Sequence, residues 1–335
     1  MSAAALLSVA YYLPQQTCST SELAAEFPEW GVEKIDAKTG IGIRHIAAHD
    51  ETSADMAFQA AQRLFESGAI TPQDVDFVVL CTQSPDHFLP TSACILQERL
   101  GVSMRAGAFD YNLGCSGFVY GLGIAKGLVE TGQARNILLL TAESYSKFMH
   151  SRDKTARTIF GDGAAAAWIG AVVPPSEGAP YIARPLYGTD GRGAKNLIVR
   201  RGALRVPGRG DDPDSFLYMN GPEIFHFTLD AVSKDIKRYI EEAELQVGEI
   251  DLFIPHQANQ FMLESIRVKL GIPRERFSIR LREFGNTVSS TIPIAIVEEA
   301  KAGRLKPDAR VLLSGFGVGY SWASVLMRWH PKFQI

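Results

Sequence analysis

Cysteine is scarce in this chain, and its spacing fits neither a metal site nor a disulfide framework. Among 335 residues there are only 4 cysteines. They are Cys18, Cys81, Cys94 and Cys115. Because no two of them form a Cys-x-x-Cys pair, zinc ribbons and thioredoxin-type redox sites are excluded. His45 and His49 lie one helical turn apart, but no neighbouring ligand completes a site, and we predict that no metal is bound.

The chain also lacks a surplus of positive charge and a long apolar run. Its 34 lysines and arginines face 37 aspartates and glutamates, for a formal net charge of −3, so nucleic-acid binding is not expected. No uncharged apolar stretch reaches the ~20 residues that span a membrane, and we predict no membrane insertion. No Lys or Arg precedes the apolar segment 3–13, which predicts a buried strand rather than a signal peptide. We therefore expect a cytoplasmic protein with reduced thiols.

What the sequence does contain is an alternation of helical and strand-like patterns. A helical pattern over residues 54–67 precedes the apolar run 75–80, and another over residues 117–130 precedes the run 136–140. Helices that alternate with short apolar strands are typical of an α/β fold. We therefore predict an α/β protein with a mostly parallel sheet.

A weak internal duplication runs through this pattern. Residues 250–254 repeat the apolar and acidic pattern of residues 75–79, and the strand at 311–313 repeats the strand at 137–140. The offset between the copies is nearly constant. Chance similarity between two amphipathic α/β units is the alternative explanation.

The duplication, if real, predicts two similar halves that share one core. They would comprise residues 1–172 and 173–335, joined within the Pro- and Gly-rich segment 172–188. The same offset places Cys115 of the first half opposite Asn286 of the second. Both residues would then lie at helix N-termini and face a common cavity.

Cys115 is the first candidate for chemistry, because glycines flank it at a predicted loop-to-helix junction. Gly114 and Gly117 permit a tight turn and a close approach of substrate. At a helix N-terminus the unpaired N–H groups favour the thiolate, which is the reactive form of cysteine. The alternative is that Cys115 is a small buried apolar residue, as most free cysteines are.

His256 and Asn286 are the other candidates. His256 follows the apolar strand 250–255, and the carboxyl ends of strands are where sites assemble in α/β sheets. A structural histidine is the alternative. Asn286 precedes the apolar helix 292–297, where an asparagine is by default a helix cap. Capping is compatible with an amide that points into a cavity.

Two glycine-rich segments complete the pattern. Segment 314–320 follows a strand, and its alternating glycines could present a backbone N–H to an oxyanion, or could simply join two strands. Segment 160–163 reads as a tight turn, and we assign it no chemistry. The sequence contains no G-x-G-x-x-G, Walker or G-x-S-x-G motif.

Cys115, His256 and Asn286, in this order and spacing, resemble the site of ketoacyl-acyl-carrier-protein synthase III, a condensing enzyme of the thiolase superfamily. The similarity covers almost the whole chain. The matching stretches are Lys38-Thr39-Gly40-Ile41, Ala108-Phe109-Asp110, Cys115-Ser116-Gly117-Phe118, Phe160-Gly161-Asp162-Gly163-Ala164, Pro255-His256-Gln257-Ala258-Asn259 and Gly285-Asn286-Thr287. The resemblance implies a five-layered αβαβα thiolase fold, a homodimer, and a cytoplasmic enzyme of fatty-acid or specialised lipid or polyketide biosynthesis.

The resemblance also implies a reaction. Cys115 would accept an acyl group from a coenzyme A or phosphopantetheine thioester, while the backbone N–H groups of Cys115 and Val318 stabilise the oxyanion. Decarboxylative Claisen condensation with malonyl-acyl-carrier protein would follow, with His256 and Asn286 as hydrogen-bond donors and Phe316 beside the sulfur. No permanently bound cofactor is implied.

The substrate-binding positions depart from the family pattern. Lys38 and Lys154 stand where the family has coenzyme A-binding arginines, and a lysine loses the bidentate geometry of arginine. Lys34 stands where an aromatic residue stacks on adenine. Phe261 replaces a basic residue that docks the carrier protein. These departures leave both coenzyme A and carrier protein open as the source of the acyl group.

The resemblance assigns three further residues to substrate binding: Gly221, Asn259 and Leu89. Leu89 matches a position that reaches across the dimer to close the partner's acyl pocket. Family members that take acetyl groups often have Phe there. Since Leu is smaller, we predict a primer longer than acetyl.

Two other functions remain open from the sequence. One is an acyltransferase of the same fold that transfers an acyl group without decarboxylation. His256 together with Asn286 argues against it, because the amide serves mainly to stabilise a carbanion. The other is a non-catalytic partner subunit of a heteromeric enzyme. Such subunits commonly lose the cysteine, and Cys115 is present.

Overall fold

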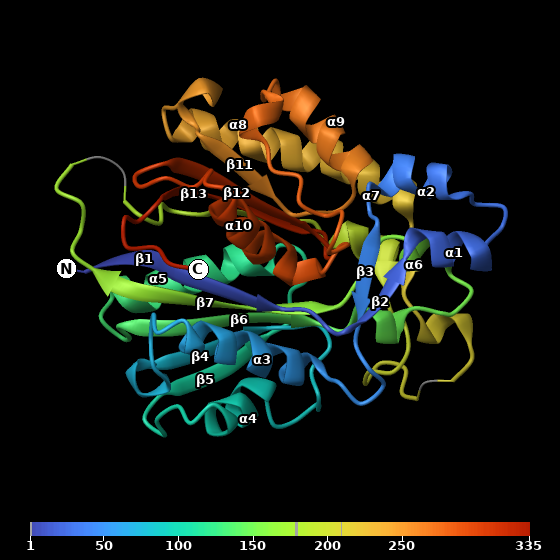
Figure 1. The fold of residues 1–335 in the computed structure, drawn as a ribbon, viewed down its shortest axis with the longest axis horizontal. Helices are drawn as coiled ribbons and strands as arrows, with labels where there is room; N and C mark the ends of the chain where they lie inside the picture. Colours follow the sequence, from blue (N-terminus) through green and yellow to red (C-terminus); the bar gives the residue numbers. More distant parts are fainter. Residues whose placement is uncertain (1, 178–179, 209) are drawn as a thin grey trace.

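Two β-sheets form the framework of the protein in the computed structural model, which describes residues 2–177, 180–208 and 210–335 (Figure 1). The first sheet has 5 strands, in the spatial order β1 (Ala3–Tyr12), β7 (Gly163–Val172), β6 (Asn136–Glu143), β4 (Phe77–Cys81) and β5 (Gly107–Tyr111). The second has 4 strands, in the order β11 (Leu252–Pro255), β12 (Arg310–Gly317), β13 (Ser321–Arg328) and β8 (Leu186–Thr189).

The two sheets repeat one pattern of strand directions. In the first, β4 pairs parallel with β6, β6 antiparallel with β7, and β7 antiparallel with β1. In the second, β11 pairs parallel with β12, β12 antiparallel with β13, and β13 antiparallel with β8. The strands predicted at 75–80 and 136–140 thus pair in parallel, as β4 and β6, and β5 also pairs in parallel with β4. The expectation of a mostly parallel sheet fails at β7 and β13, each of which runs antiparallel to both of its neighbours.

Helices cover both sheets and fill the space between them (Figure 1). The helices on the outer face of the first sheet are α3 (Ser53–Glu66) and α4 (Ser92–Arg99). Those between the sheets are α5 (Gly117–Glu130) and α10 (Thr291–Lys301). Those over the second sheet are α8 (Ser233–Glu242) and α9 (Gln260–Leu270). The order of layers is thus helix, sheet, helix, sheet, helix.

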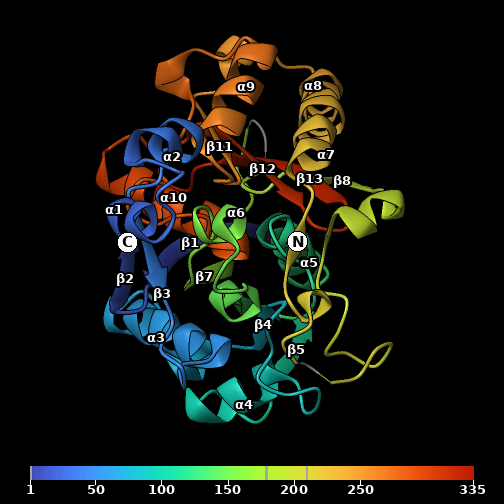
Figure 2. The ribbon, with the colours of Figure 1, turned by 90° about the vertical axis from the view of Figure 1, so that its right-hand side faces the viewer.

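Shorter elements gather at one end of the molecule, on the right in Figure 1 and facing the viewer in Figure 2. Four short helices lie there: α1 (Thr20–Glu26), α2 (Val32–Thr39), α6 (Lys154–Arg157) and α7 (Gly221–Phe227). The small strands pair as β2 (Gln16–Ser19) with β3 (Ile43–Ile46), and as β9 (Leu197–Ile198) with β10 (Tyr218–Met219). This end also receives the segment that leads into α5.

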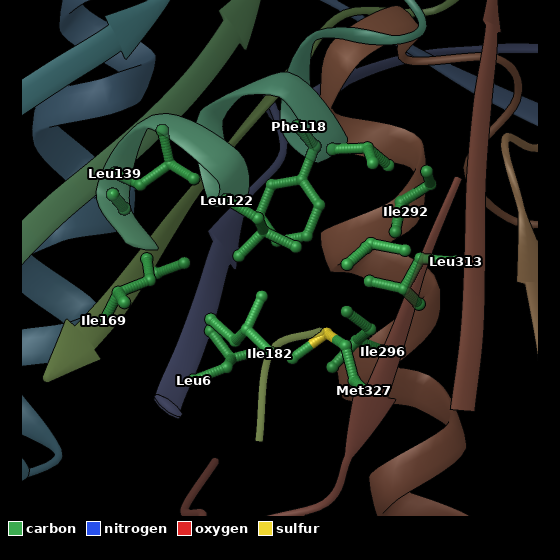
Figure 3. Packing of buried hydrophobic residues seen from close by; sticks show 14 of the residues in the cluster. Leu6, Phe118, Leu122, Leu139, Ile169, Ile182, Ile292, Ile296, Leu313 and Met327 are labelled. Carbon is green, nitrogen blue, oxygen red and sulfur yellow. The ribbon is translucent and has the colours of Figure 1, made fainter. Parts of the chain in front are cut away.

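The largest apolar core lies between the two sheets (Figure 3). Phe118 and Leu122 of α5 point toward Ile292 and Ile296 of α10, and all four are at most 1% exposed. Burying each such side chain contributes about 1.5–3 kcal/mol. The shared core of α5 and α10 matters for the site, because each helix follows a segment that carries a candidate catalytic residue.

The observed elements follow the sequence patterns closely. The helix predicted over residues 117–130 is α5, and the helix predicted over residues 54–67 is α3, shifted by one residue. The predicted joint 172–188 connects β7 of the first sheet to β8 of the second, although residues 178 and 179 of it lie outside the described residues. The division into halves at residue 172 remains a prediction. Among the described residues, no helix is long and apolar enough to cross a bilayer.

Candidate active site

Cys115 lies in the turn between β5 and α5. The residue before it, Gly114, has little room for a side chain. The N–H of Gly117 donates to the carbonyl oxygen of Gly114 at 2.7 Å, which closes the turn. A Cβ atom on Gly114 would lie 2.5 Å from Oε1 of Gln83 and 2.7 Å from Cγ1 of Val318. Glycine is therefore required at this position for steric reasons. The thiol itself is only 5% exposed.

The end of β12 packs directly on this turn. A Cβ atom on Gly317 would lie 2.8 Å from both Cβ and Sγ of Cys115, so only glycine allows the two segments to meet. The hydroxyls of Ser116 and Ser321 lie 2.6 Å apart and join the cysteine turn to the start of β13. Segment 314–320 does connect two antiparallel strands, β12 and β13. That same turn places Val318 next to the sulfur.

The expected preference of Cys115 for the thiolate was wrong. Burial raises the pKa of the Cys115 thiol to about 12, and the nearby Glu143 carboxylate adds to the rise. The backbone N–H groups of Cys115 and Val318 act in the opposite direction but are outweighed. Cys115 also precedes Ser116, the N-cap of α5, so it lies just outside the helix rather than in its first turn. Desolvation of a charge is costlier than a helix end can compensate.

His256 follows the last residue of β11, and its backbone N–H donates to Ser314 of β12 at 2.8 Å. The imidazole is 2% exposed, and burial lowers its pKa to about 3, so the ring is neutral at physiological pH. Its Nδ1 lies 2.7 Å from the hydroxyl of Thr291, and its ring meets Phe316 edge to face with centroids 5.4 Å apart. A neutral imidazole can act as a hydrogen-bond donor.

Asn286 is held by hydrogen bonds on both its backbone and its side chain. Its N–H donates to Ile159 at 2.9 Å, and its carbonyl accepts from Gly161 at 3.1 Å. Its Oδ1 accepts the N–H of Val288 at 2.9 Å, a local bond to the residue two positions on. The amide nitrogen, Nδ2, therefore points the other way and lies 3.5 Å from Nε2 of His256. The expected helix cap was wrong, because Ser290 and not Asn286 is the N-cap of α10.

One cavity brings the three candidate residues together. It encloses about 430 Å³, including the solvent at its mouth. Most of its wall is apolar. The residues that line it are Cys115, Ile159, Phe160, Leu197, Met219, Ile224, Thr228, His256, Ala258, Asn259, Met262, Asn286, Phe316 and Gly317. A thiol, a neutral imidazole and a carboxamide thus face one largely apolar space, as is usual for a ligand site.

The remaining predicted substrate-binding residues lie outside this cavity. Leu89 is 83% exposed on the surface, so it cannot close the acyl cavity of its own chain. Gly221 is the first residue of α7, and Ile224 of the same helix lines the cavity in its place. Lys38 and Lys154 lie at the end of the molecule that carries α2 and α6.

The sequence reasoning missed an aromatic residue at this end. The ammonium groups of Lys34 and Lys154 each lie 5.5 Å from the ring centre of Trp30, and that of Lys38 lies at 5.7 Å. Lys154 also forms an ion pair with Glu29 at 2.7 Å. Helix α2 packs against α9, which begins next to the cavity. The spacing gave no signal for Trp30, because this residue precedes Gly31, the N-cap of α2, and so lies outside the helix that carries Lys34 and Lys38.

Two other features of the site were not assigned a role from the sequence. Phe160, in the segment to which we assigned no chemistry, lines the cavity, and its neighbour Gly161 anchors Asn286. Glu143 is fully buried near Cys115 and accepts hydrogen bonds from the N–H of Gln83 and the hydroxyl of Ser289, each at 3.0 Å. Burial raises the pKa of Glu143 to about 8.

Comparison with known proteins identifies the family. The family described as 3-oxoacyl-[acyl-carrier-protein (ACP)] synthase III matches residues 109–191, and its C-terminal part matches residues 240–329. A β-ketoacyl-[acyl-carrier-protein] synthase III from Caldanaerobacter subterraneus subsp. tengcongensis is 35% identical over 330 residues, which cover 98% of each chain. The chain belongs to the synthase III family.

Solved structures of synthase III agree with this assignment. A 3-oxoacyl-(acyl-carrier-protein) synthase III is 48% identical with a TM-score of 0.94, over 98% of this chain and 100% of that one. The priming β-ketosynthase of the R1128 polyketide pathway is 29% identical with a TM-score of 0.87, over 98% of this chain and 96% of that one. The protein therefore has the thiolase fold and is an acyl-transferring condensing enzyme, as its resemblance to the family predicted.

The raised pKa of Cys115 in this synthase III can be tested by alkylation. We expect the rate of iodoacetamide labelling at Cys115 to rise about tenfold per pH unit between about pH 7 and 9, because only the thiolate reacts and its fraction grows at pH values below the pKa. Peptide mass analysis would follow Cys115, with exposed Cys94 as an internal control for the reagent. A rate that levels off below about pH 8 would show a stabilised thiolate instead.

Proposed function

We propose that this enzyme makes a β-ketoacyl thioester in two steps, with Cys115 as acyl acceptor and with His256 and Asn286 as the donors that stabilise a carbanion. The observation that supports this most directly is the shared cavity, which holds the sulfur and both donor side chains. In the part of the chain that the structure describes, no ionised side chain lines that cavity. Hydrogen-bond donors in such a water-poor space stabilise a developing oxyanion strongly.

In the first step, Cys115 attacks the carbonyl carbon of an acyl thioester. The carbon–sulfur bond to the donor breaks, the acyl group remains on Cys115, and the donor leaves as a thiol that carries the proton lost by the cysteine. The N–H groups of Cys115 and Val318 act on the sulfur in the resting site. We assign them to the oxyanion of the tetrahedral intermediate, and Phe316 to the wall beside the sulfur.

In the second step, malonyl-acyl-carrier protein enters the emptied part of the cavity. Its terminal carbon–carbon bond breaks, CO₂ leaves, and the electron pair forms an enolate whose oxygen accepts hydrogen bonds from His256 and Asn286. The carbanion attacks the acyl group on Cys115, a carbon–carbon bond forms, and the cysteine sulfur leaves and takes up a proton from solvent. The products are a β-ketoacyl-carrier thioester and CO₂.

The partners follow from this reaction. We assign coenzyme A and phosphopantetheine thioesters as substrates and acyl carrier protein as partner. Asn259 lines the cavity, and Phe261, two residues further along the chain, is 59% exposed and stacked on Phe225. A homodimer would account for the exposure of Leu89. Cytoplasmic location remains a prediction from the sequence.

Release of labelled CO₂ tests the proposed reaction. We expect the wild type to form an acyl-enzyme and to release CO₂ from malonyl-carrier labelled in its free carboxyl group. Asn286→Ala should lower CO₂ release about 100-fold or more, because one oxyanion donor is lost, while Cys115 is still acylated. Cys115→Ala should show no acyl adduct. Acyl transfer without CO₂ release from the wild type would favour the non-decarboxylating acyltransferase, and no adduct at all would favour a non-catalytic subunit.

A primer longer than acetyl is the second proposal, and it rests on Leu89 in the partner's pocket. Intact-mass screening with thioesters of increasing chain length should show preferred acylation of Cys115 by a chain longer than acetyl. Leu89→Phe should shift the preference toward shorter chains, because the larger ring fills the pocket. Val173→Phe, at an 84% exposed position beyond β7, is the matched control and should change nothing. Acylation of the wild type by acetyl alone would contradict the proposal.

The third proposal is that an acyl-coenzyme A is the acyl donor. It rests on the three lysines around Trp30. An indole surrounded by ammonium groups fits an adenine ring with its phosphates. Trp30→Ala should lower kcat/KM for an acyl-coenzyme A about tenfold, in line with the loss of one stacked base. The same variant should act normally on the matching acyl-pantetheine, which lacks the nucleotide. Equal kcat/KM of variant and wild type on acyl-coenzyme A would point to a carrier-bound donor.

A further inference from the structure

The hydroxyl of Thr291 lies behind the imidazole of His256, on the side away from the cavity. It is 2.7 Å from Nδ1 of His256 and 3.0 Å from the carbonyl oxygen of Val288. Thr291 is the first residue of α10 and is 3% exposed. The hydroxyl has a single proton, which it can donate either to Nδ1 or to the carbonyl.

The choice between these two acceptors decides where the ring carries its own proton. His256 is neutral, since burial lowers its pKa to about 3, so one ring nitrogen is protonated and the other is not. If Thr291 donates to the carbonyl of Val288, its oxygen accepts from a protonated Nδ1, and Nε2 has no proton. If Thr291 donates to Nδ1, the proton of the ring is on Nε2.

The carbonyl of Val288 also contacts the ring and acts to raise the pKa of His256, which suits a protonated Nδ1 in the empty site. The proposed function, by contrast, requires the second arrangement. The Oδ1 atom of Asn286 is occupied by the N–H of Val288, which leaves Nδ2 as a donor toward the cavity. Nδ2 and Nε2 of His256 are 3.5 Å apart. Two donors at this separation can both reach one substrate oxygen at ordinary hydrogen-bond length. Without a proton on Nε2, His256 would instead accept from the amide and offer the substrate nothing.

We propose that Thr291 is a positioning residue, whose hydroxyl donates to Nδ1 of His256 and thereby keeps the proton of the ring on Nε2, facing the cavity. The hydroxyl thus acts on the second step through the imidazole and does not touch the substrate. The proposal rests on the function proposed above, in which His256 donates a hydrogen bond to the thioester carbonyl. It implies that replacing Thr291 by a side chain without a hydrogen-bond donor slows the condensation step and leaves the acylation of Cys115 unchanged.

Three variants test this. Thr291→Val has the shape of threonine without the hydroxyl, and we expect CO₂ release and condensation to fall about 10- to 100-fold, with acylation of Cys115 unchanged. Thr291→Ser keeps the donor and should restore most of the rate. Thr287→Val is the matched control, since Thr287 is also buried in this segment and its hydroxyl has no hydrogen-bond partner among the described residues. It should act as wild type.

The results separate the alternatives. Full condensation activity in Thr291→Val would overturn the proposal, and so would an equal loss of both steps, which indicates a merely structural role. If the wild type itself releases no CO₂, the proposed function fails rather than the role of Thr291.

A spectroscopic measurement on the wild type does not depend on how the variants fold. With ¹⁵N-labelled imidazoles, the signal of His256 can be assigned among the 7 histidines by its loss in His256→Gln. We expect a protonated Nε2 and an unprotonated Nδ1. A protonated Nδ1 would contradict the proposal directly.

Discussion

The contact between the end of β12 and the cysteine turn is the constraint on which the site depends. Gly317 lies against the side chain of Cys115, and a Cβ atom on Gly315 would lie 2.8 Å from Cα of Ser116. No other residue type fits either position without moving the backbone. Because β12 also accepts the N–H of His256 through Ser314, its placement fixes the imidazole as well as the sulfur. The fit of the end of β12 against the cysteine turn therefore sets the positions of the Cys115 sulfur, the His256 imidazole and the Val318 N–H.

Burial at this contact makes the resting site electrically neutral. The pKa of Cys115 is raised to about 12 and that of His256 is lowered to about 3, so the site does not hold a thiolate–imidazolium pair at neutral pH. The thiol is consequently a weak nucleophile until substrate arrives, and acylation depends on the oxyanion donors. An acylated cysteine carries no charge, which suits a cavity beside the buried Glu143. The same neutrality leaves His256 free to donate a hydrogen bond, a role that an ionised neighbour would disturb.

The sequence predicted the parts of this site that lie at the ends of regular elements. Cys115, His256 and Asn286 stand where a strand ends or a helix begins, so periodicity and glycine positions located them. The wall of the cavity was not predictable in this way, because Leu197 and Met219 belong to a two-residue pairing of short strands far from the catalytic segments. Local patterns carry no information about which distant segments meet.

Trp30 and the sheet directions show a different limit. Counting back from Lys38 led to Lys34, whereas the structure places Trp30 next to both lysines across the start of α2. The fixed spacing fails because Trp30 precedes the N-cap of α2, so the turn before the helix and not helical periodicity sets the contact. The direction of β7 was missed for another reason: this strand is buried on both faces, so its apolar run has the pattern of a parallel strand although it pairs antiparallel.

Hydrogen bonds beneath the cavity explain how residues from distant parts of the chain stay in register. The hydroxyl of Ser290 lies 2.9 Å from that of Thr141 on β6, and Ser289 donates to Glu143 at the end of the same strand. Both serines immediately precede α10, so they tie the segment that carries Asn286 and Thr291 to the first sheet. These groups are buried, and breaking one bond would leave its partner unsatisfied at a cost of about 1–3 kcal/mol. The donors of the second step are thus held against the first sheet, whose edge strand β5 leads to Cys115, and this keeps the acyl acceptor and the carbanion stabilisers in one fixed arrangement.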